Sequence, residues 1–415
     1  MKVASVELTN LDVPFEQHAG QHLQYWIAPW RIVQVCKLTL DNGVVGWGET
    51  IPNATHSRVP DDIAERIAGE EAAALLWRDD LGAGVQIALF DAVAKNENVP
   101  ICDLLGPRVR NGCPISWWTC DMGPEDWARQ CEMAVTRGYM SAKLKTRPWQ
   151  DLHACLQAVL RVVPPQFRLD LDFNGHLVNA ANAVPLLKSL EQYEQLAMIE
   201  TPIPQEDIAG NLQVRSRINR PIAMHVDRPP IMTVLRDDIA DGLIIGGGAS
   251  QLMQQQAVVA AANKPFWLQL VGTGITTAWA AHVGAVCPEA RWPAITCMNI
   301  YQSQLLKRPI EVQGGYYPVP AGPGLGIEID EAAVQKYAVD YSTVREVRHF
   351  YRYVRSGGAS AHIAGNRSAF HGRYRQAGLP LFEAGSTLEV IADDGSGEFA
   401  EFYSEIERHG VFFGE

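Results

Sequence analysis

A short apolar run followed by a segment of helical periodicity recurs seven times along the middle of the chain, roughly every 25 residues. Strands that alternate with helices at this period form a parallel sheet that can close into a barrel. We therefore predict an α/β fold, a (β/α) TIM-type barrel over residues 111–320. An open doubly wound sheet is the alternative, but no glycine-rich phosphate motif follows the first run. The predicted strands are 114–118, 140–144, 167–171, 196–199, 221–224, 242–245 and 266–270, with a weak eighth at 294–297.

The segment before the barrel has a different pattern. Residues 3–8 and 32–38 alternate apolar and polar side chains, and Asp41-Asn42-Gly43 predicts a turn into a partner strand at 44–48. Residues 60–94 then have a helical pattern. A β-meander followed by helices predicts an N-terminal α+β capping domain over residues 1–110.

The last part of the chain, residues 321–415, is predicted to return to the capping domain and then to form an arginine-rich extension. A run of like charge is typical of a solvated face or a flexible arm, and a contact between subunits or a substrate-steering arm is the alternative. The segment between residues 344 and 376 contains a single acid, Glu346, and these arginines: Arg345, Arg348, Arg352, Arg355, Arg367, Arg373 and Arg375.

The overall charge limits the class of partner. A net charge of −12 argues against nucleic acid and against an anionic membrane surface. No apolar stretch reaches the roughly 18–20 residues that span a bilayer, and the N-terminus has no signal-like apolar block, so we expect a cytoplasmic protein. The eight cysteines are scattered and are expected to be buried free thiols.

Polar residues that could take part in catalysis or metal binding lie where the predicted strands end. Functional side chains of a parallel barrel collect at these strand ends. Lys143 and Lys145 are two residues apart and would point to the same face of a strand, where each cation lowers the pKa of the other and favours a lysine base. Asp172 and Glu200 are one barrel repeat apart, and converging carboxylates require a cation such as Mg²⁺.

These motifs, in their order along residues 1–330, resemble the enolase superfamily, in particular the mandelate racemase/muconate lactonizing branch. The matching pieces are Asp41-Asn42-Gly43, Gly46-Trp47-Gly48-Glu49, Ala88-Leu89-Phe90-Asp91, Pro100, Leu104-Leu105-Gly106, Lys143-x-Lys145, Asp172-x-Asn174, Glu200-x-Pro202 and Pro323-Gly324-Leu325-Gly326. The resemblance implies that a bound Mg²⁺ holds a substrate carboxylate, that a barrel residue removes the α-proton, and that the metal stabilises the enediolate. It also implies that Lys145 is the base and that Lys143 assists it.

The third metal position departs from the family pattern, which places an acid there. Here Pro221-Ile222-Ala223-Met224 leads into His225, with Asp227 two residues further on the same side. If His225 is the ligand, the site suits Mn²⁺, iron or zinc at least as well as Mg²⁺. Both residues stay candidates.

The side of the barrel across from the lysines also departs from the pattern, because strands six to eight end without the expected lysine, histidine or acid. The ends are Ile244-Ile245-Gly246-Gly247-Gly248, Gln269-Leu270-Val271-Gly272-Thr273-Gly274 and Arg291-Trp292-Pro293-Ala294. A racemase needs groups on both faces of its substrate, whereas a lyase can work with one. We therefore expect dehydration of a small hydroxy-acid or sugar acid. A racemase, epimerase or cycloisomerase of the same superfamily, or a non-catalytic descendant with a degraded site, is the alternative.

The expected partner is a small-molecule carboxylate, and resemblance to the family suggests a homo-oligomer. Candidate substrate-binding residues lie at the strand ends and in the loops that would cover the barrel mouth. Core packing is the competing role for the aromatic ones. The candidates are Asn174, Trp118, Trp26, Tyr25 and His22, with His18, Trp30 and His56 in the same loops.

Overall fold

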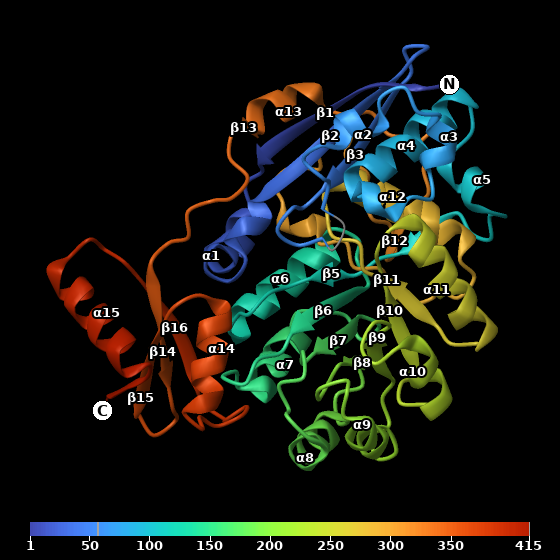
Figure 1. Ribbon diagram of the computed structural model, residues 1–415. Coiled ribbons are helices and arrows are strands. Elements are labelled where there is room, and N and C mark those ends of the chain that lie inside the picture. The colour runs from blue at the N-terminus through green and yellow to red at the C-terminus, as the bar shows by residue number, and fades with distance from the viewer. Residues whose placement is uncertain (56–57, 415) are drawn as a thin grey trace.

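The N-terminal unit of the computed structural model is a four-stranded antiparallel sheet with helices on one face (Figure 1). Gly43, at φ +84°, closes the predicted hairpin turn, and its amide donates to Leu40 O at 2.9 Å. The sheet order is β13 (Ala338–Val339), β1 (Val3–Asp12), β2 (Ile32–Leu40) and β3 (Val45–Thr50). The structure describes residues 1–55 and 58–414, so His56 lies outside the described part of the chain.

The helical part of this unit differs from the prediction of one continuous pattern. Short pieces precede the long helix α4 (Ala83–Asn96), which packs on β3. A Cβ on Gly46 would lie 2.0 Å from Ala88 O, so the glycine allows the helix to approach the strand closely. The other elements are α1 (Gln17–Trp26), η1 (Ala28–Arg31), α2 (Ile63–Ile67), α3 (Ala72–Leu75), η2 (Asp79–Leu81) and α5 (Ile101–Leu105).

The predicted barrel is confirmed as a curled sheet of seven parallel strands. The weak eighth strand is reduced to single parallel bridges, Ala294 with Ile115 and Ile295 with Gln269, which join the two ends of the sheet. The predicted first strand is split, because β4 (Gly112–Pro114) pairs instead with β12 (Tyr316–Pro318). The ring runs β5 (Trp117–Trp118), β6 (Ser141–Lys145), β7 (Arg168–Asp172), β8 (Leu196–Glu200), β9 (Ile222–His225), β10 (Gly242–Ile245) and β11 (Phe266–Leu268).

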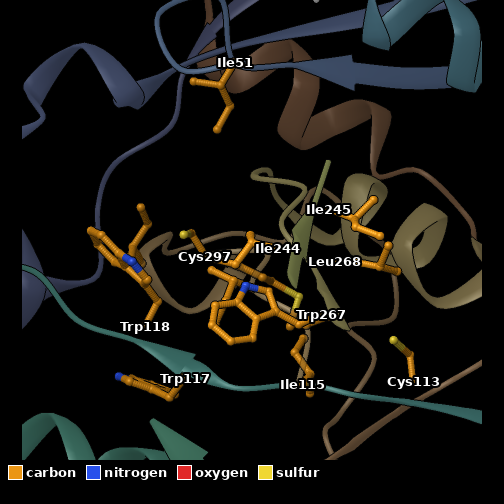
Figure 2. Close-up of a cluster of buried hydrophobic side chains, with 14 of the residues drawn as sticks. Ile51, Cys113, Ile115, Trp117, Trp118, Ile244, Ile245, Trp267, Leu268 and Cys297 are labelled. Atoms are coloured by element: carbon orange, nitrogen blue, oxygen red, sulfur yellow. The ribbon is translucent and has the colours of Figure 1, made fainter. Parts of the chain in front are cut away.

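Local signals begin several of the helices that surround the ring. Asp151 caps α7 (Leu152–Leu160) by accepting from Ala154 N at 2.9 Å, and Asp207 caps α9 (Ile208–Arg215) by accepting from Gly210 N at 2.9 Å. Figure 2 shows part of the apolar barrel interior, including Ile115, Ile244 and Trp267. The remaining helices are α6 (Pro124–Thr136), α7 (Leu152–Leu160), α8 (Ala180–Leu190), α9 (Ile208–Arg215), α10 (Ile231–Asp237), α11 (Ala249–Ala261), α12 (Gly274–Val286), η3 (Met298–Ile300) and α13 (Glu331–Tyr337).

The arginine-rich extension is a folded α+β unit, which corrects its interpretation as a flexible arm. Four antiparallel strands in the order β16-β14-β15-β17 carry two helices, and the unit packs beside α1, α6 and α7 (Figure 1). Its aromatic residues, not its arginines, form the core: Tyr351, Tyr353 and Phe370 are fully buried. Its elements are β14 (His349–Val354), β15 (Ser360–Ala364), α14 (Arg367–Gln376), β16 (Thr387–Ala392), α15 (Gly397–His409) and β17 (Phe412–Gly414).

All eight cysteines are buried free thiols. Among the helices of the described residues, none combines the length and the apolar character that crossing a bilayer requires.

Candidate active site

The register of the barrel brings the lysine and acid positions together at the carboxyl ends of three neighbouring strands. Lys145 on β6 pairs with Asp172 on β7, and Asp172 pairs with Glu200 on β8. Lys143 Nζ lies 2.5 Å from Glu200 Oε2 and 3.3 Å from Asp172 Oδ2, and Lys145 Nζ also contacts Asp172 Oδ2. Asn174 accepts from Lys145 Nζ at 3.2 Å.

Burial and the neighbouring charges act differently on the two lysines. Lys143 is 1% exposed, and although burial favours its neutral form, the carboxylates of Glu200 and Asp172 raise its pKa. Burial lowers the pKa of Lys145; Asp172 opposes this effect and the charge of Lys143 adds to it. Lys145 is 14% exposed at the end of the strand, so it is the amine of the pair that a bound molecule can reach.

The structure separates the two candidates for the third metal position. His225 Nε2 lies 3.2 Å from Glu200 Oε1, and the amide of Gln205 holds the His225 backbone through bonds of 3.0 and 3.2 Å. Asp227 lies in the turn after β9 and is exposed. His225 therefore contacts one of the two carboxylates, that of Glu200, and within the described residues Asp227 forms no ion pair with this group.

The donor set fits a divalent cation. Asp172 and Glu200 are buried, and both oxygens of Glu200 lack a well-directed hydrogen bond from the described residues. Buried carboxylates in this state require a positive charge, which Lys143 provides between them. Asp172, Glu200 and His225 offer two carboxylates and one imidazole, a set that Mn²⁺, iron or zinc accepts as readily as Mg²⁺.

A cavity of about 470 Å³ opens at the strand ends beside Lys143 and Lys145, and all three units line it, whereas Asp172, Glu200 and His225 do not. The barrel contributes Lys143, Lys145 and Asn174 among others, and the capping domain contributes Trp30. Trp118 stacks on Trp30, with ring centroids 5.9 Å apart. The rest of the lining is Arg367, Ser368 and His371 from α14, together with His176, Gln269, Val271, Ile295 and Cys297.

The side of the cavity across the barrel from β6 carries no side chain suited to proton transfer among the described residues. In an eight-position ring the sixth strand lies opposite the second. Here β6 is the second strand and β10 is the sixth, and β10 leads into Gly246 and Gly247, which have no side chain. Gln269, from the neighbouring position, accepts from Lys143 Nζ at 3.1 Å. The thiol of Cys297 lies at the eighth position, only two places from β6, and burial raises its pKa to about 12.

Two of the predicted substrate-binding residues, Trp118 and Asn174, line this cavity. Tyr25 and Trp26 lie outside it, because the extension packs against them. Trp26 stacks on Tyr351 at 4.7 Å, and the ring of Tyr25 lies 4.9 Å from that of His349.

His22 also lies outside the cavity, in a contact between α1 and α6. Asp126 faces His18 Nε2 at 3.0 Å and His22 Nε2 at 3.3 Å. The three donor atoms lie within 4.8 Å of one another, a spacing that could hold a metal. However, Trp117 Nε1 donates to Gln130 Oε1 at 3.0 Å, which leaves Gln130 Nε2 to donate to His18 Nδ1 at 2.8 Å. His18 Nε2 then carries the proton and donates it to Asp126, so the group is a polar contact between cap and barrel.

Sequence reasoning did not place Arg367, Ser368 and His371 at the site. The density of arginines was the available signal, and a substrate-steering arm was one interpretation of it, but a charge pattern cannot identify which arginine faces a cavity.

Comparison with known proteins agrees with this arrangement. Residues 126–333 match the family model described as enolase C-terminal domain-like. N-succinyl-L-Arg/Lys racemase of Bacillus cereus is 23% identical over 377 residues, covering 83% of this chain and 100% of the relative. Its crystal structure superposes with a TM-score of 0.68, at 20% identity over 83% of this chain and all of that chain.

Two further relatives differ in reaction or in what they bind. D-gluconate dehydratase of Thermoproteus tenax is 22% identical over 291 residues, covering 63% of this chain and 57% of the relative. An enolase from Thermobispora bispora, solved in complex with magnesium and formate, has a TM-score of 0.66 at 20% identity, covering 81% of this chain and 92% of that chain.

Proposed function

Because this chain belongs to the enolase C-terminal domain-like family, in its mandelate racemase/muconate lactonizing branch, we propose that it removes the proton α to a carboxylate and eliminates a β-hydroxyl group. The substrate is a small hydroxy-acid or sugar acid with hydroxyl groups on both the α- and the β-carbon, and the product is the corresponding 2-oxo-3-deoxy acid. The observation that carries this proposal is the one-sided placement of Lys145, which faces the cavity across from the glycines that follow β10.

Lys145 takes the α-proton as its neutral amine. The Cα–Cβ double bond then forms, the β-carbon–oxygen bond breaks, and the same ammonium returns its proton to the departing hydroxyl, which leaves as water. The enol that remains tautomerises to the 2-oxo acid. Because one group performs both proton transfers, the two bonds break on the same face of the substrate. Lys143 and Asn174 lie on either side of Lys145. They orient both this lysine and the substrate.

A divalent ion is the cofactor of the proposal, Mg²⁺ or, given an imidazole ligand, Mn²⁺. Asp172, Glu200 and His225 would hold it. Bound there, the ion would supply the positive charge that makes the α-proton of a carboxylate acidic enough to remove. The magnesium in the structural relative and the two Glu200 oxygens, which lack a well-directed hydrogen bond from the described residues, both support this assignment.

Replacement of the base tests the proposal. Hydroxy-acids and sugar acids are incubated with the protein and Mg²⁺ or Mn²⁺, and 2-oxo acid formation is followed. Lys145→Ala is expected to reduce turnover by at least about 100-fold, whereas Lys307→Ala, which changes an exposed lysine, is expected to behave like the wild type. Normal turnover in Lys145→Ala would contradict the proposal.

The relatives include a racemase as well as a dehydratase, so the alternatives need a separate readout. Incorporation of solvent deuterium at the α-carbon without 2-oxo acid formation would indicate a racemase, epimerase or cycloisomerase. Neither exchange nor tight binding of a divalent ion would indicate a non-catalytic descendant.

A further inference from the structure

Helix α14 of the C-terminal extension places one cationic side chain in the catalytic cavity. Arg367 lies at its first turn and lines the same 470 Å³ space as Lys143 and Lys145. Arg367 and Ser368 also line a second hollow of about 360 Å³ between the capping domain and the extension. Arg367 therefore stands where a molecule passing from that hollow would meet the catalytic cavity.

The charge of Arg367 is only partly matched by the protein. The acid that faces it, Asp121, is buried and already paired with the fully buried Arg147, whose Nε lies 2.8 Å from Asp121 Oδ1. Arg367 Nε lies 3.8 Å from the other oxygen, beyond hydrogen-bonding distance. Among the described residues, its guanidinium donates no hydrogen bond, so this group of three carries one surplus positive charge.

Docking of the extension depends on other contacts. Trp149, in the loop after β6, lies 4.6 Å from Phe370, and Trp26 stacks on Tyr351. Ser386 Oγ donates to Trp149 O at 3.1 Å, and Gly385 N donates to Asp151 Oδ2 at 2.8 Å. Since apolar packing and backbone hydrogen bonds hold the unit in place, the guanidinium of Arg367 remains available to a bound molecule.

We propose that Arg367 binds a second anionic group of the substrate, so that the preferred substrate is a dianionic hydroxy-acid with one carboxylate at the lysines and another at the extension. The imidazoles of His176 and His371 stay neutral beside Arg367, because burial and then the charge of Arg147 lower the pKa of each to about 2. Because these two rings carry no charge, Arg367 is the cation that α14 directs at the cavity. This inference rests on the proposed function for the position of the first carboxylate.

The test uses pairs of hydroxy-acids that differ only in their far end, such as D-gluconate, which ends in a hydroxymethyl group, and D-glucarate, which ends in a carboxylate. Affinities are measured by calorimetry on the full chain with Mg²⁺ or Mn²⁺. We expect the wild type to bind the diacid of at least one pair about 10- to 100-fold more tightly than the monoacid. Arg367→Gln is expected to remove that preference and leave monoacid affinity unchanged, and Arg367→Lys to restore part of it.

Arg375→Gln is the matched control, because it removes the same charge from an exposed position on the same helix. Melting curves and tryptophan fluorescence report whether the extension stays docked in each variant. If no diacid binds more tightly than its monoacid, or if the preference survives in a folded Arg367→Gln, the inference is wrong. Loss of turnover in Lys145→Ala with a retained diacid preference would support both proposals, and a diacid preference without any turnover would contradict only the dehydratase.

Discussion

Lys143 Nζ lies 2.5 Å from Glu200 Oε2, and each side chain is only 1% exposed. A buried ion pair of this kind contributes little net stability relative to an apolar pair, but removal of one partner leaves an unmatched buried charge. Variants of this pair can therefore separate its contribution to the proposed catalytic site from its contribution to the free energy of unfolding.

We expect Lys143→Met to lower the free energy of unfolding by about 3–5 kcal/mol, because the buried Glu200 then loses its closest cationic partner. Lys143→Met combined with Glu200→Gln is expected to recover much of that loss, although it removes the proposed metal ligand. Urea unfolding of the two single variants and the double variant, in buffer without divalent ions, gives the coupling free energy. Strictly additive losses would show that the two groups do not depend on each other.

The placement of His225 against Glu200 predicts its role in metal binding. Calorimetric titration with Mn²⁺ is expected to show at least about 100-fold weaker binding for His225→Ala, since changes to outer ligand contacts alone cost about 10- to 100-fold. Asp227→Ala is expected to bind like the wild type, because the exposed Asp227 lies away from the carboxylates. The reverse result would assign the third position to Asp227 and require the end of β9 to move when the ion binds.

The histidine pair at the junction of barrel and extension predicts a pH dependence. The rings of His176 and His371 lie 4.8 Å apart, and the pKa of each falls from its ordinary 6.5 to about 2. The folded state therefore binds fewer protons than the unfolded state, so the stability that the pair contributes is complete above about pH 6.5 and is lost progressively as the pH falls toward 2. Arg147, Arg367 and Arg375 oppose protonation, and Asp121 favours it at His176.

Hydrogen exchange of α14 measures this effect. Protection is expected to decrease between about pH 7 and pH 4 in the wild type, and to decrease less in His371→Gln, which has one titrating ring fewer. Equal pH dependence in the two proteins would show that these rings do not control docking. His153→Gln is a suitable control, because the His153 ring on α7 contacts Ser189 on α8 and Tyr193 in the loop that follows α8.

The barrel and most of the lysine–acid cluster could be predicted because their signals are local. Each strand carries its own apolar run, and the regular repeat places Lys145, Asp172 and Glu200 at equivalent positions of neighbouring strands. The choice between His225 and Asp227 could not be made in the same way, since both point to one side of an ideal strand. It depends on where β9 ends, and Gln205, from the loop between β8 and α9, fixes that end.

The extension shows the opposite case. Its arginines dominate the composition, whereas its aromatic residues determine its structure by contacting Trp26 and Trp149, which are hundreds of residues earlier in the chain. Contacts over such separations leave no periodic trace in the sequence. For the same reason Tyr25 and Trp26, which were expected in loops over the barrel mouth but lie at the end of α1, could not be recognised as packing residues until their partners were placed.

The shared aromatic contacts of Trp26 also have a consequence for synthesis of the protein. Helix α1 leaves the ribosome before the barrel, and the rings of Tyr351 and Phe370 that cover Trp26 leave after it. Strand β13, which pairs with β1, likewise comes after the whole barrel. A nascent chain therefore carries an exposed indole and an unpaired strand edge while the barrel is translated, the kind of surface that chaperones bind. Premature termination before β14 would leave a barrel with its lysines in place and an uncovered aromatic face beside its mouth.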